Sequence, residues 1–552
     1  MADDSKRTER WWERKTIYQI YPRSFADSNG DGVGDLGGII SRLEYLKTLG
    51  IEIIWLSPIY TSPMDDNGYD ISNYTDIAPE YGTLADFDRL VSEARRRGIG
   101  IVLDLVVNHT SDEHPWFVEA RKSVDNRFRD FYIWRKPRPD GSAPNSLTSS
   151  FGGPAWTLDP ATGEYYLHLF SRRQPDLNWE NPQVRNEIYK MMNWWLDRGI
   201  AGFRMDVIDY IGKQVDREVV TDGPHLHTYL QEMRRQTFAD RDILTVGEAW
   251  SATPGSALLY SGRDRNELSM VFQFEHVTQQ WDEVYGKWRS RPFDLIRLKS
   301  VLNKWQYALA DDGWNSLFWG NHDLPRAVSK YGDVKGYPVE SAKMLATVLH
   351  LMKGTPFVYQ GEEIGMTNVP FSKIEQYRDI ETLNMHRLHL EAGLSPEDFI
   401  KGANENGRDN ARTPMQWTPE ANAGFTTGIP WIEINENYTV INAEQAISDE
   451  HSIWNHYRKL IALRKNSPIV VHGRYQSYLD HHPDVFVYSR RLGDEFMVVV
   501  ASFSARIITV ELPEELLVSG QCLISNYAPV TRLAGVVELQ PYEAFAILVM
   551  RT

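Results

Sequence analysis

The chain has 552 residues, of which 42% are hydrophobic and 24% charged, a composition typical of a globular protein with one large domain and additions. Its 59 Lys and Arg residues against 75 Asp and Glu residues give a formal net charge of -16. This charge excludes nucleic acid and anionic membranes as partners unless a basic patch intervenes, and the sequence has no such patch. The single cysteine, Cys522, excludes an internal disulfide and fits a reducing compartment.

The start of the chain and its hydropathy also bear on location. Residues 1–6 lack the basic start and the apolar core of a signal peptide, and no apolar run is long enough to span a bilayer. We therefore expect a cytoplasmic protein without a membrane partner, either a monomer or a small homo-oligomer.

Short apolar runs alternate with amphipathic segments along most of the chain. Helical periodicity is predicted for segments such as 39–49, 84–97, 182–198 and 342–352. A strand followed by a helix, repeated eight times, is typical of parallel strands that close a (β/α)8 TIM barrel, and an open, doubly wound sheet is the alternative. The eight predicted strands are 16–21, 51–56, 100–107, 202–208, 244–248, 270–274, 317–319 and 356–360.

Two insertions and a change of pattern interrupt this alternation. Residues 110–178, rich in Pro, Gly, Ser and aromatic residues, predict an inserted subdomain after the third strand, and residues 367–442 predict a helical and loop excursion after the eighth. Strands without helices predict a separate antiparallel β domain over residues 467–552. The predicted fold class is therefore α/β, with the barrel built from residues 1–109 and 179–466.

Four of the predicted strands end in polar, titratable residues. In a (β/α)8 barrel the carboxyl ends of the strands line one mouth, where active sites lie. Arg204 and Asp206 point the same way by strand alternation, and a buried charged pair is costly unless it serves a function. The residues predicted at this mouth are His109, Arg204, Asp206, Glu248, His322 and Asp323.

Three carboxylates without a nucleophilic Ser or Cys motif favour hydrolysis of a glycosidic bond, which needs one carboxylic acid and one carboxylate. The Arg204 guanidinium should lower the pKa of Asp206 and make it the nucleophile, whereas the apolar surroundings of Glu248 favour a proton donor. Asp323 and the two histidines would bind sugar hydroxyls. A zinc or two-metal site is the weaker alternative, because the histidines lack the H-x-x-x-H spacing.

The ordered motifs resemble the four signature regions of the α-amylase family, glycoside hydrolase family 13. These motifs are 104–109 (DLVVNH), 202–206 (GFRMD), Glu248 and 321–323 (NHD). Two further segments, 360–366 (QGEEIGM) and 408–417 (RDNARTPMQW), resemble the oligo-1,6-glucosidase and dextran glucosidase branch. Members of this branch release glucose from a non-reducing end with retention.

The resemblance implies a role for each matching position. Asp206 would form a covalent glucosyl intermediate, Glu248 would act first as acid and then as base, and Asp323 would stabilise the transition state. Contacts that enclose the terminal glucose would come from Asp70, Arg408 and Phe151.

Val207 directly follows the expected nucleophile and bears on the linkage that is cut. A valine here resembles the α-1,6-acting enzymes of the branch, whereas smaller or hydroxyl-bearing residues resemble the α-1,4-acting ones. Strict strand alternation, however, would turn Val207 away from the pocket. The expected linkage therefore depends on where this side chain lies.

Residues 27–35 (DSNGDGVGD) form a second motif. Oxygen donors at alternate positions, with glycines for sharp turns, are similar to the first half of an EF-hand calcium loop without its terminal Glu and flanking helices. The family resemblance favours a structural Ca²⁺ ion and no organic cofactor. Its ligands would be Asp27, Asn29, Asp31, the carbonyl of Val33, and Asp35.

Other functions share parts of this pattern. Trehalose-6-phosphate hydrolases would differ by basic residues near the outer sugar's phosphate, for which Lys287, Arg289 and Arg291 are candidates. Sucrose isomerases are similar, but their Arg-Leu-Asp-Arg-Asp signature is absent, and non-catalytic transporter subunits lack the carboxylates. We therefore expect a retaining, exo-acting α-glucosidase for α-1,6-linked oligosaccharides, with α-1,4, sucrose or transglucosylation activity as further alternatives.

Overall fold

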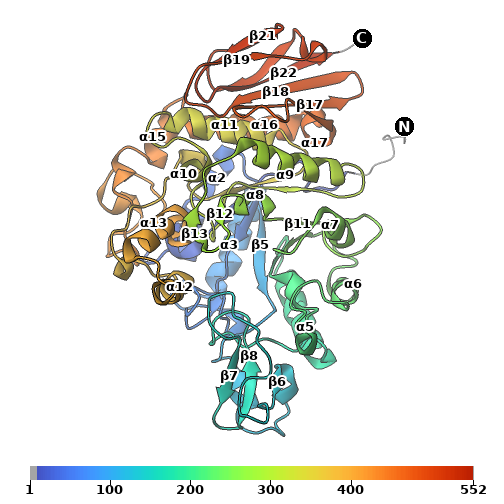
Figure 1. Cartoon of the computed structure of the whole chain (residues 1–552), viewed down its shortest axis with the longest axis vertical. Helices are drawn as coiled ribbons and strands as arrows, with labels where there is room; N and C mark the ends of the chain where they lie inside the picture. Colours follow the sequence, from blue (N-terminus) through green and yellow to red (C-terminus); the bar gives the residue numbers. More distant parts are fainter. Residues whose placement is uncertain (1–8, 551–552) are drawn as a thin grey trace.

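Eight parallel strands form a nearly closed barrel at the centre of the computed structural model, which describes residues 9–550 (Figure 1). Their order is β11-β10-β9-β5-β2-β1-β15-β14, and a parallel bridge between Val271 and Asn315 joins β11 to β14. The predicted barrel is confirmed, and each strand overlaps its predicted range. The alternative prediction of an open, doubly wound sheet is wrong. The strands are β1 (Ile17–Ile20), β2 (Ile53–Leu56), β5 (Gly100–Val106), β9 (Gly202–Asp206), β10 (Leu244–Glu248), β11 (Met270–Phe272), β14 (Ser316–Leu317) and β15 (Thr355–Tyr359).

Amphipathic helices cover the outside of the barrel. α3 (Leu84–Arg96) begins with a capping box in which Thr83 accepts from the N–H of Asp86, and its apolar face is buried. The segment predicted as one helix over 39–49 is divided at Arg42, whose backbone (φ -105°, ψ 4°) leaves the helical region. The covering helices also include α1 (Leu36–Ser41), α2 (Leu43–Leu49), α5 (Pro182–Asp197), α6 (Leu226–Thr237), α7 (Pro254–Ser261), α9 (Leu295–Ala308), α11 (Pro338–His350) and α16 (Ile453–Asn466).

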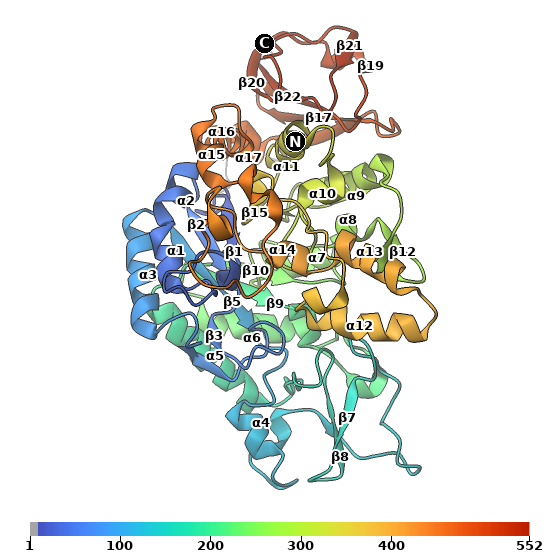
Figure 2. The ribbon, with the colours of Figure 1, turned by 90° about the vertical axis from the view of Figure 1, so that its left-hand side faces the viewer.

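Two segments leave the barrel next to its carboxyl-end mouth. Residues 110–178 form the end of the molecule farthest from the C-terminal sheets, and they carry a three-stranded sheet (Figures 1 and 2). The excursion after β15 packs its helix α13 on the hairpin strand β13. The elements are α4 (Pro115–Ala120), β6 (Trp134–Arg135), β7 (Trp156–Asp159), β8 (Glu164–Leu167), β12 (Trp281–Asp282), β13 (Gly286–Ser290), α12 (Ile380–Glu391), α13 (Pro396–Asn406) and α14 (Asp409–Arg412).

The C-terminal part is an antiparallel five-stranded sheet, β16-β17-β18-β22-β20, with the separate pair β19-β21. It packs on α11, as Figure 1 shows at the top of the molecule. Residues 468–472 form a short helix, α17 (Pro468–His472), where the sequence predicted no helix, because Pro468 suits a first helical position. The strands are β16 (Arg474–Tyr478), β17 (Val485–Leu492), β18 (Glu495–Ser502), β19 (Ile508–Glu511), β20 (Gln521–Ser525), β21 (Val536–Leu539) and β22 (Ala544–Met550).

The hydrophobic core lies on both sides of the barrel wall. Inward-facing side chains such as Ile17, Ile53, Val102, Leu244 and Phe272 fill the barrel, and a larger set packs between the strands and the helices. Within residues 9–550, no helix combines the length and the apolar character needed to cross a membrane.

Candidate active site

Three carboxylates converge on one arginine at the carboxyl ends of β5, β9 and β10. Arg204 is 1% exposed, and its Nη1 lies 2.8 Å from Asp206 Oδ1 and 2.9 Å from Asp104 Oδ1. Its Nη2 lies 2.6 Å from Glu248 Oε2. Asp206 and Glu248 are thus held on neighbouring nitrogens of one guanidinium, and both line the same cavity.

The predicted lowering of the Asp206 pKa is wrong. Burial raises the pKa of Asp206, and the neighbouring Glu248 and Asp104 carboxylates raise it further, against the opposing charge of Arg204. One guanidinium cannot neutralise three carboxylates. Ionisation of Asp206 is therefore opposed by the two carboxylates that share its guanidinium.

Glu248 is held at both of its oxygens. Oε2 accepts from the backbone N–H of Val207 at 3.1 Å, and Oε1 accepts from the indole N–H of Trp250 at 3.0 Å. Trp250 is itself stacked on Phe274, with ring centroids 3.8 Å apart and planes at 9°. Sequence reasoning did not assign Trp250 a role, although it stands only two residues after Glu248. The carboxyl group of Glu248 therefore has one defined orientation.

Val207 faces the cavity because strand alternation stops one residue before it. β9 ends at Asp206, and Val207 adopts a left-handed backbone conformation with φ 34° and ψ 47°. This conformation is a genuine outlier for a β-branched residue. It turns the side chain into the cavity wall and the N–H toward Glu248.

Asp323 is held ionised among positive groups. Its Oδ1 lies 3.0 Å from Arg412 Nη2 and 3.3 Å from Arg408 Nη1. Burial alone would raise the pKa of Asp323, but the N–H of His322 and the charges of Arg408 and Arg412 hold this pKa well below its usual range.

His322 lies behind Asp323 rather than in the cavity. Burial lowers the pKa of His322 to about 3, so the imidazole is neutral. Its Nδ1 accepts from Gln19 Nε2 at 2.8 Å, which leaves the Nε2–H to donate to Asp323 Oδ2 at 3.1 Å.

Arg408 lines the cavity and contacts two acidic residues and an aromatic ring. Its Nη2 lies 2.5 Å from Asp379 Oδ1 and 3.2 Å from Asp66 Oδ1, and its guanidinium lies over the ring of Phe151 at 4.8 Å. Asp66 and Asp379 were missed by sequence reasoning. No motif spacing could link Asp66 to Arg408, because they lie 342 residues apart in the chain.

The structure corrects the predicted position of Asp70. Its carboxylate accepts from the backbone N–H groups of Asp65 (2.8 Å) and Asp66 (3.0 Å) and from Ser62 Oγ (3.0 Å), inside the loop after β2. Asp70 is fully buried and does not line the cavity, whereas Asp66 does. Asp70 therefore shapes the loop that presents Asp66.

The cavity has a volume of about 560 Å³ and brings together most of the predicted residues. His109 lines it, and burial lowers the pKa of His109 to about 4, so this imidazole is neutral as well. Arg204, His322 and Asp70 lie behind the cavity wall. The predicted residues that line it are His109, Phe151, Asp206, Val207, Glu248, Asp323 and Arg408.

Aromatic residues and the β12-β13 hairpin form the open side of the cavity. Trp281 stacks on Trp250 with ring centroids 6.1 Å apart, and Val284 at the hairpin tip is 79% exposed. Lys287 Nζ pairs with Glu381 Oε2 at 2.5 Å, and Arg291 pairs with Glu283 at 2.9 Å. Two of the three predicted phosphate-binding candidates are therefore already paired with acidic groups, and the third, Arg289, lies over the ring of Tyr285 at 5.9 Å.

The predicted calcium loop folds as a series of tight turns near the start of α1. Asp27 accepts from the N–H groups of residues 29, 30 and 32, while Asp35 caps α1 through Gly38. Asn29 and Asp31 are exposed. The oxygen donors suit a hard cation such as Ca²⁺, although no group of three or more His, Cys, Asp or Glu side chains is arranged to hold a metal within residues 9–550.

Comparisons with known proteins identify the family of this chain. Residues 19–473 match the family description "Alpha amylase, catalytic domain". The chain is 57% identical to a palatinase from Erwinia rhapontici (98% of this chain, 99% of the relative) and 54% identical to an oligo-1,6-glucosidase from Halalkalibacterium halodurans (97% and 98%). The crystal structure of a Bacillus licheniformis trehalose-6-phosphate hydrolase mutant superposes with a TM-score of 0.94 at 45% identity, covering 98% of this chain and 100% of that chain.

Proposed function

Since this chain belongs to the alpha-amylase family and is an α-glucosidase of glycoside hydrolase family 13, we propose that it removes single glucose units from the non-reducing ends of α-1,6-linked oligosaccharides. The observation that carries the proposal is the pair Asp206 and Glu248, held on one guanidinium in a cavity that Arg408 also lines. In the proposed binding mode, Arg408 and Phe151 lie behind the terminal glucose. A pocket closed behind one sugar limits cleavage to the chain end.

The pair performs a two-step displacement. An oxygen of Asp206 attacks the anomeric carbon while Glu248 gives its proton to the departing glycosidic oxygen, and the bond to the aglycone breaks. Glu248 then takes a proton from water, which attacks the glucosyl ester and frees Asp206. Carboxylates on neighbouring guanidinium nitrogens lie close together, which favours the retaining geometry of about 5 Å over the wider inverting one.

The remaining residues bind and stabilise the terminal glucose. Asp323, ionised beside two arginines, lies where positive charge develops at the anomeric carbon. Asp66 and His109 offer acceptor and donor groups to hydroxyls, and Phe151 walls the closed end. We assign to Asp66 the contact with the terminal glucose that the family resemblance implied for Asp70.

Val207 supports the α-1,6 linkage. Its side chain lies in the cavity wall, and in the proposed binding mode it narrows the space on the leaving-group side. An α-1,6 bond adds a flexible methylene between the two sugars, so its aglycone passes a narrow point more easily than the ring of an α-1,4 substrate.

The test is a comparison of kcat/KM for isomaltose, isomaltotriose, isomaltulose, maltose, sucrose and trehalose 6-phosphate. We expect the α-1,6-linked sugars to be preferred. A higher kcat/KM for trehalose 6-phosphate would overturn the assignment, and the ion pairs of Lys287 and Arg291 argue against that outcome.

We also propose a structural Ca²⁺ ion bound by Asp27, Asn29, Asp31, the Val33 carbonyl and Asp35. The carboxylates of Asp27 and Asp35 would reorient little on binding, because backbone N–H groups of the turns already hold them. Metal analysis and the melting temperature with and without chelator test this. No bound calcium and an unchanged melting temperature would refute it.

We further propose a cytoplasmic location and a monomer or small homo-oligomer. The single cysteine supports a reducing compartment. Fractionation of the source cells and light scattering of the purified protein test these two points.

A further inference from the structure

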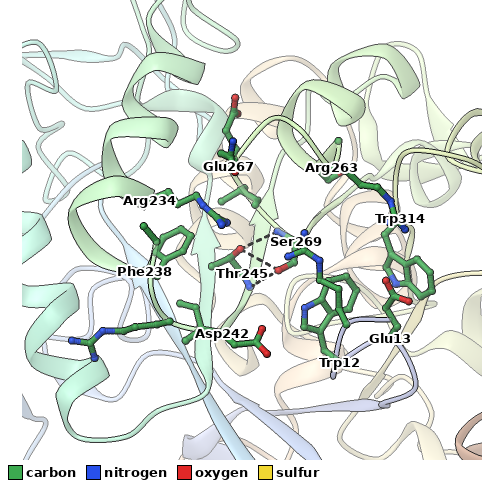
Figure 3. A pocket seen from close by; sticks show the side chains of 18 of the residues that line it. Trp12, Glu13, Arg234, Phe238, Asp242, Thr245, Arg263, Glu267, Ser269 and Trp314 are labelled. Carbon is green, nitrogen blue, oxygen red and sulfur yellow. Dashed lines mark hydrogen bonds between the residues drawn. The ribbon is translucent and has the colours of Figure 1, made fainter. Parts of the chain in front are cut away.

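The strand β10, which carries Glu248 at its carboxyl end, is fixed at its amino end by a pair of side chains. Thr245 Oγ1 accepts from the backbone N–H of Ser269 at 2.9 Å, and Ser269 Oγ accepts from the N–H of Thr245 at 3.2 Å. Figure 3 shows these bonds in a polar cavity of about 390 Å³ at the end of the barrel opposite the carboxylates. The amino end of β10 is thus held by the segment before β11.

Beyond Glu248, the chain is bound to the loop that follows the proposed nucleophile. Ser251 Oγ donates to Asp209 Oδ2 at 2.6 Å, and the backbone N–H of Ser251 donates to the same oxygen at 3.3 Å. Asp209 is fully buried in the short helix η4 (Ile208–Tyr210), three residues after Asp206. Since β9 and β10 are neighbours in the barrel, this contact joins the two loops that carry the proposed nucleophile and the proposed acid.

The contact at Ser251 fixes the turn that presents Trp250 to Glu248. Only Ala249 and Trp250 lie between Ser251 and the end of β10. Ala249 is fully buried, and its carbonyl accepts from the N–H of Ala252 at 3.2 Å, which closes a turn over these residues. Because the turn is held at both ends, the indole N–H of Trp250 is directed toward Glu248 Oε1, at 3.0 Å.

Asp209 has no part in the proposed chemistry itself. It does not line the catalytic cavity, and its Oδ1 has no hydrogen-bond partner within residues 9–550. Burial raises the pKa of Asp209 to about 7, against the hydrogen bonds from Ser251, and the carboxylates of Asp222 and Glu248 act in the same direction as burial. A proton on Oδ1 leaves Oδ2 free to accept from Ser251, so the contact requires an acceptor oxygen and not a negative charge.

We propose that Asp209 is a positioning residue for Glu248, because it holds Ser251 and through it Trp250, whose indole N–H orients the carboxyl group that protonates the departing oxygen. The inference rests on the proposed role of Glu248 as the acid. Loss of the acceptor at Asp209 should therefore impair proton donation, whereas attack by Asp206 does not depend on this contact.

The test is kcat/KM of Asp209→Ala, Asp209→Asn and Ser251→Ala for aryl α-glucosides whose leaving groups range from phenol to 2,4-dinitrophenol. Ala at position 209 removes the acceptor, Asn keeps an acceptor oxygen without a charge, and Ser251→Ala removes the hydroxyl donor alone. Glu248→Gln is the reference, because loss of the acid itself shows how far each substrate needs a proton.

Asp222→Asn is the matched control. Asp222 also lies between β9 and α6, is exposed, and accepts from Tyr260 at 2.6 Å. Its side chain makes no hydrogen bond to residues 248–251 in the part of the chain that the structure describes. Thermal unfolding of each variant verifies that it is folded.

We expect Asp209→Ala to lower kcat/KM by about tenfold or more for the phenyl glucoside and by less than about threefold for the dinitrophenyl one, which needs no proton. Asp209→Asn should keep most of the activity, and Ser251→Ala should show the same dependence on the leaving group with a smaller loss. Asp222→Asn should behave as the wild type. Adding Trp250→Phe to Asp209→Ala should cost little more with the phenyl glucoside, because both changes act on one hydrogen bond.

An equal loss with every leaving group would overturn the inference, since Asp209 would then serve the fold and not the acid. Multiplied losses in the double variant would overturn it as well. If Asp209→Ala does not fold, Ser251→Ala decides by the same criterion. Failure of the proposed mechanism is distinguishable, because Glu248→Gln would then show no dependence on the leaving group, and the inference would fail with it.

Discussion

Replacing Trp250 with Phe tests whether the indole N–H positions the acid Glu248. The substitution removes the 3.0 Å hydrogen bond to Oε1 and keeps an aromatic ring to stack on Phe274. A hydrogen bond to a charged group contributes about 1.5–3 kcal/mol, which corresponds to about a 10- to 150-fold loss in kcat/KM when proton donation is needed. Glu248 keeps its bonds to Arg204 and Val207, so the loss should lie toward the lower end of this range.

The assay is kcat/KM for a series of aryl α-glucosides, from phenyl to 4-nitrophenyl and 2,4-dinitrophenyl. A good leaving group needs no proton, so Trp250→Phe should cost most with the phenyl substrate and little with the dinitrophenyl one. Trp281→Phe is the control, because Trp281 stacks on Trp250 without contacting Glu248 through a hydrogen bond in the described structure. An equal loss of activity with every leaving group would refute the positioning role of Trp250.

Other predictions concern the nucleophile, the linkage and pH. Asp206→Asn should lower kcat by about a thousandfold or more, and near-normal turnover of isomaltose would contradict the mechanism. Val207→Ala should raise the ratio of maltose to isomaltose activity, and an unchanged ratio would remove Val207 as the linkage determinant. Burial raises the pKa of Glu362 from 4.5 to about 8, so the folded state holds a proton that the unfolded state releases. The free energy of unfolding should therefore fall as pH rises from about 4.5 to 8. The variant Glu362→Gln still accepts a hydrogen bond from Tyr457, and it should melt higher than the wild type at pH 9 but not at pH 4. Equal melting temperatures at pH 9 would contradict this.

The raised pKa of Asp206 connects the electrostatics to the proposed chemistry. Retaining cleavage requires one protonated and one ionised carboxyl group at the same site. Three carboxylates share the single guanidinium of Arg204, which disfavours the ionisation of all three at once. Asp323, with its own arginines, stays ionised throughout.

The sequence by itself determined the barrel and indicated the carboxylates that we propose as catalytic. Apolar runs and amphipathic segments report the period of local structure, so eight strands and their order along the chain follow from them. Asp206, Glu248 and Asp323 each stand at or just after the end of such a run, and the carboxyl ends of barrel strands meet at one mouth. Local patterns therefore suffice to bring these residues together.

Only the tertiary structure decided the details of the pocket. Alternation predicted that Val207 faces away, but β9 ends at Asp206 and Val207 adopts a left-handed conformation in which its N–H donates to Glu248. Asp66 meets Arg408 across 342 residues, and the pKa of Asp206 depends on Asp104 and Glu248 from two other strands. Such contacts and charges arise between distant segments, and they are set by three-dimensional packing that no local pattern of residues records.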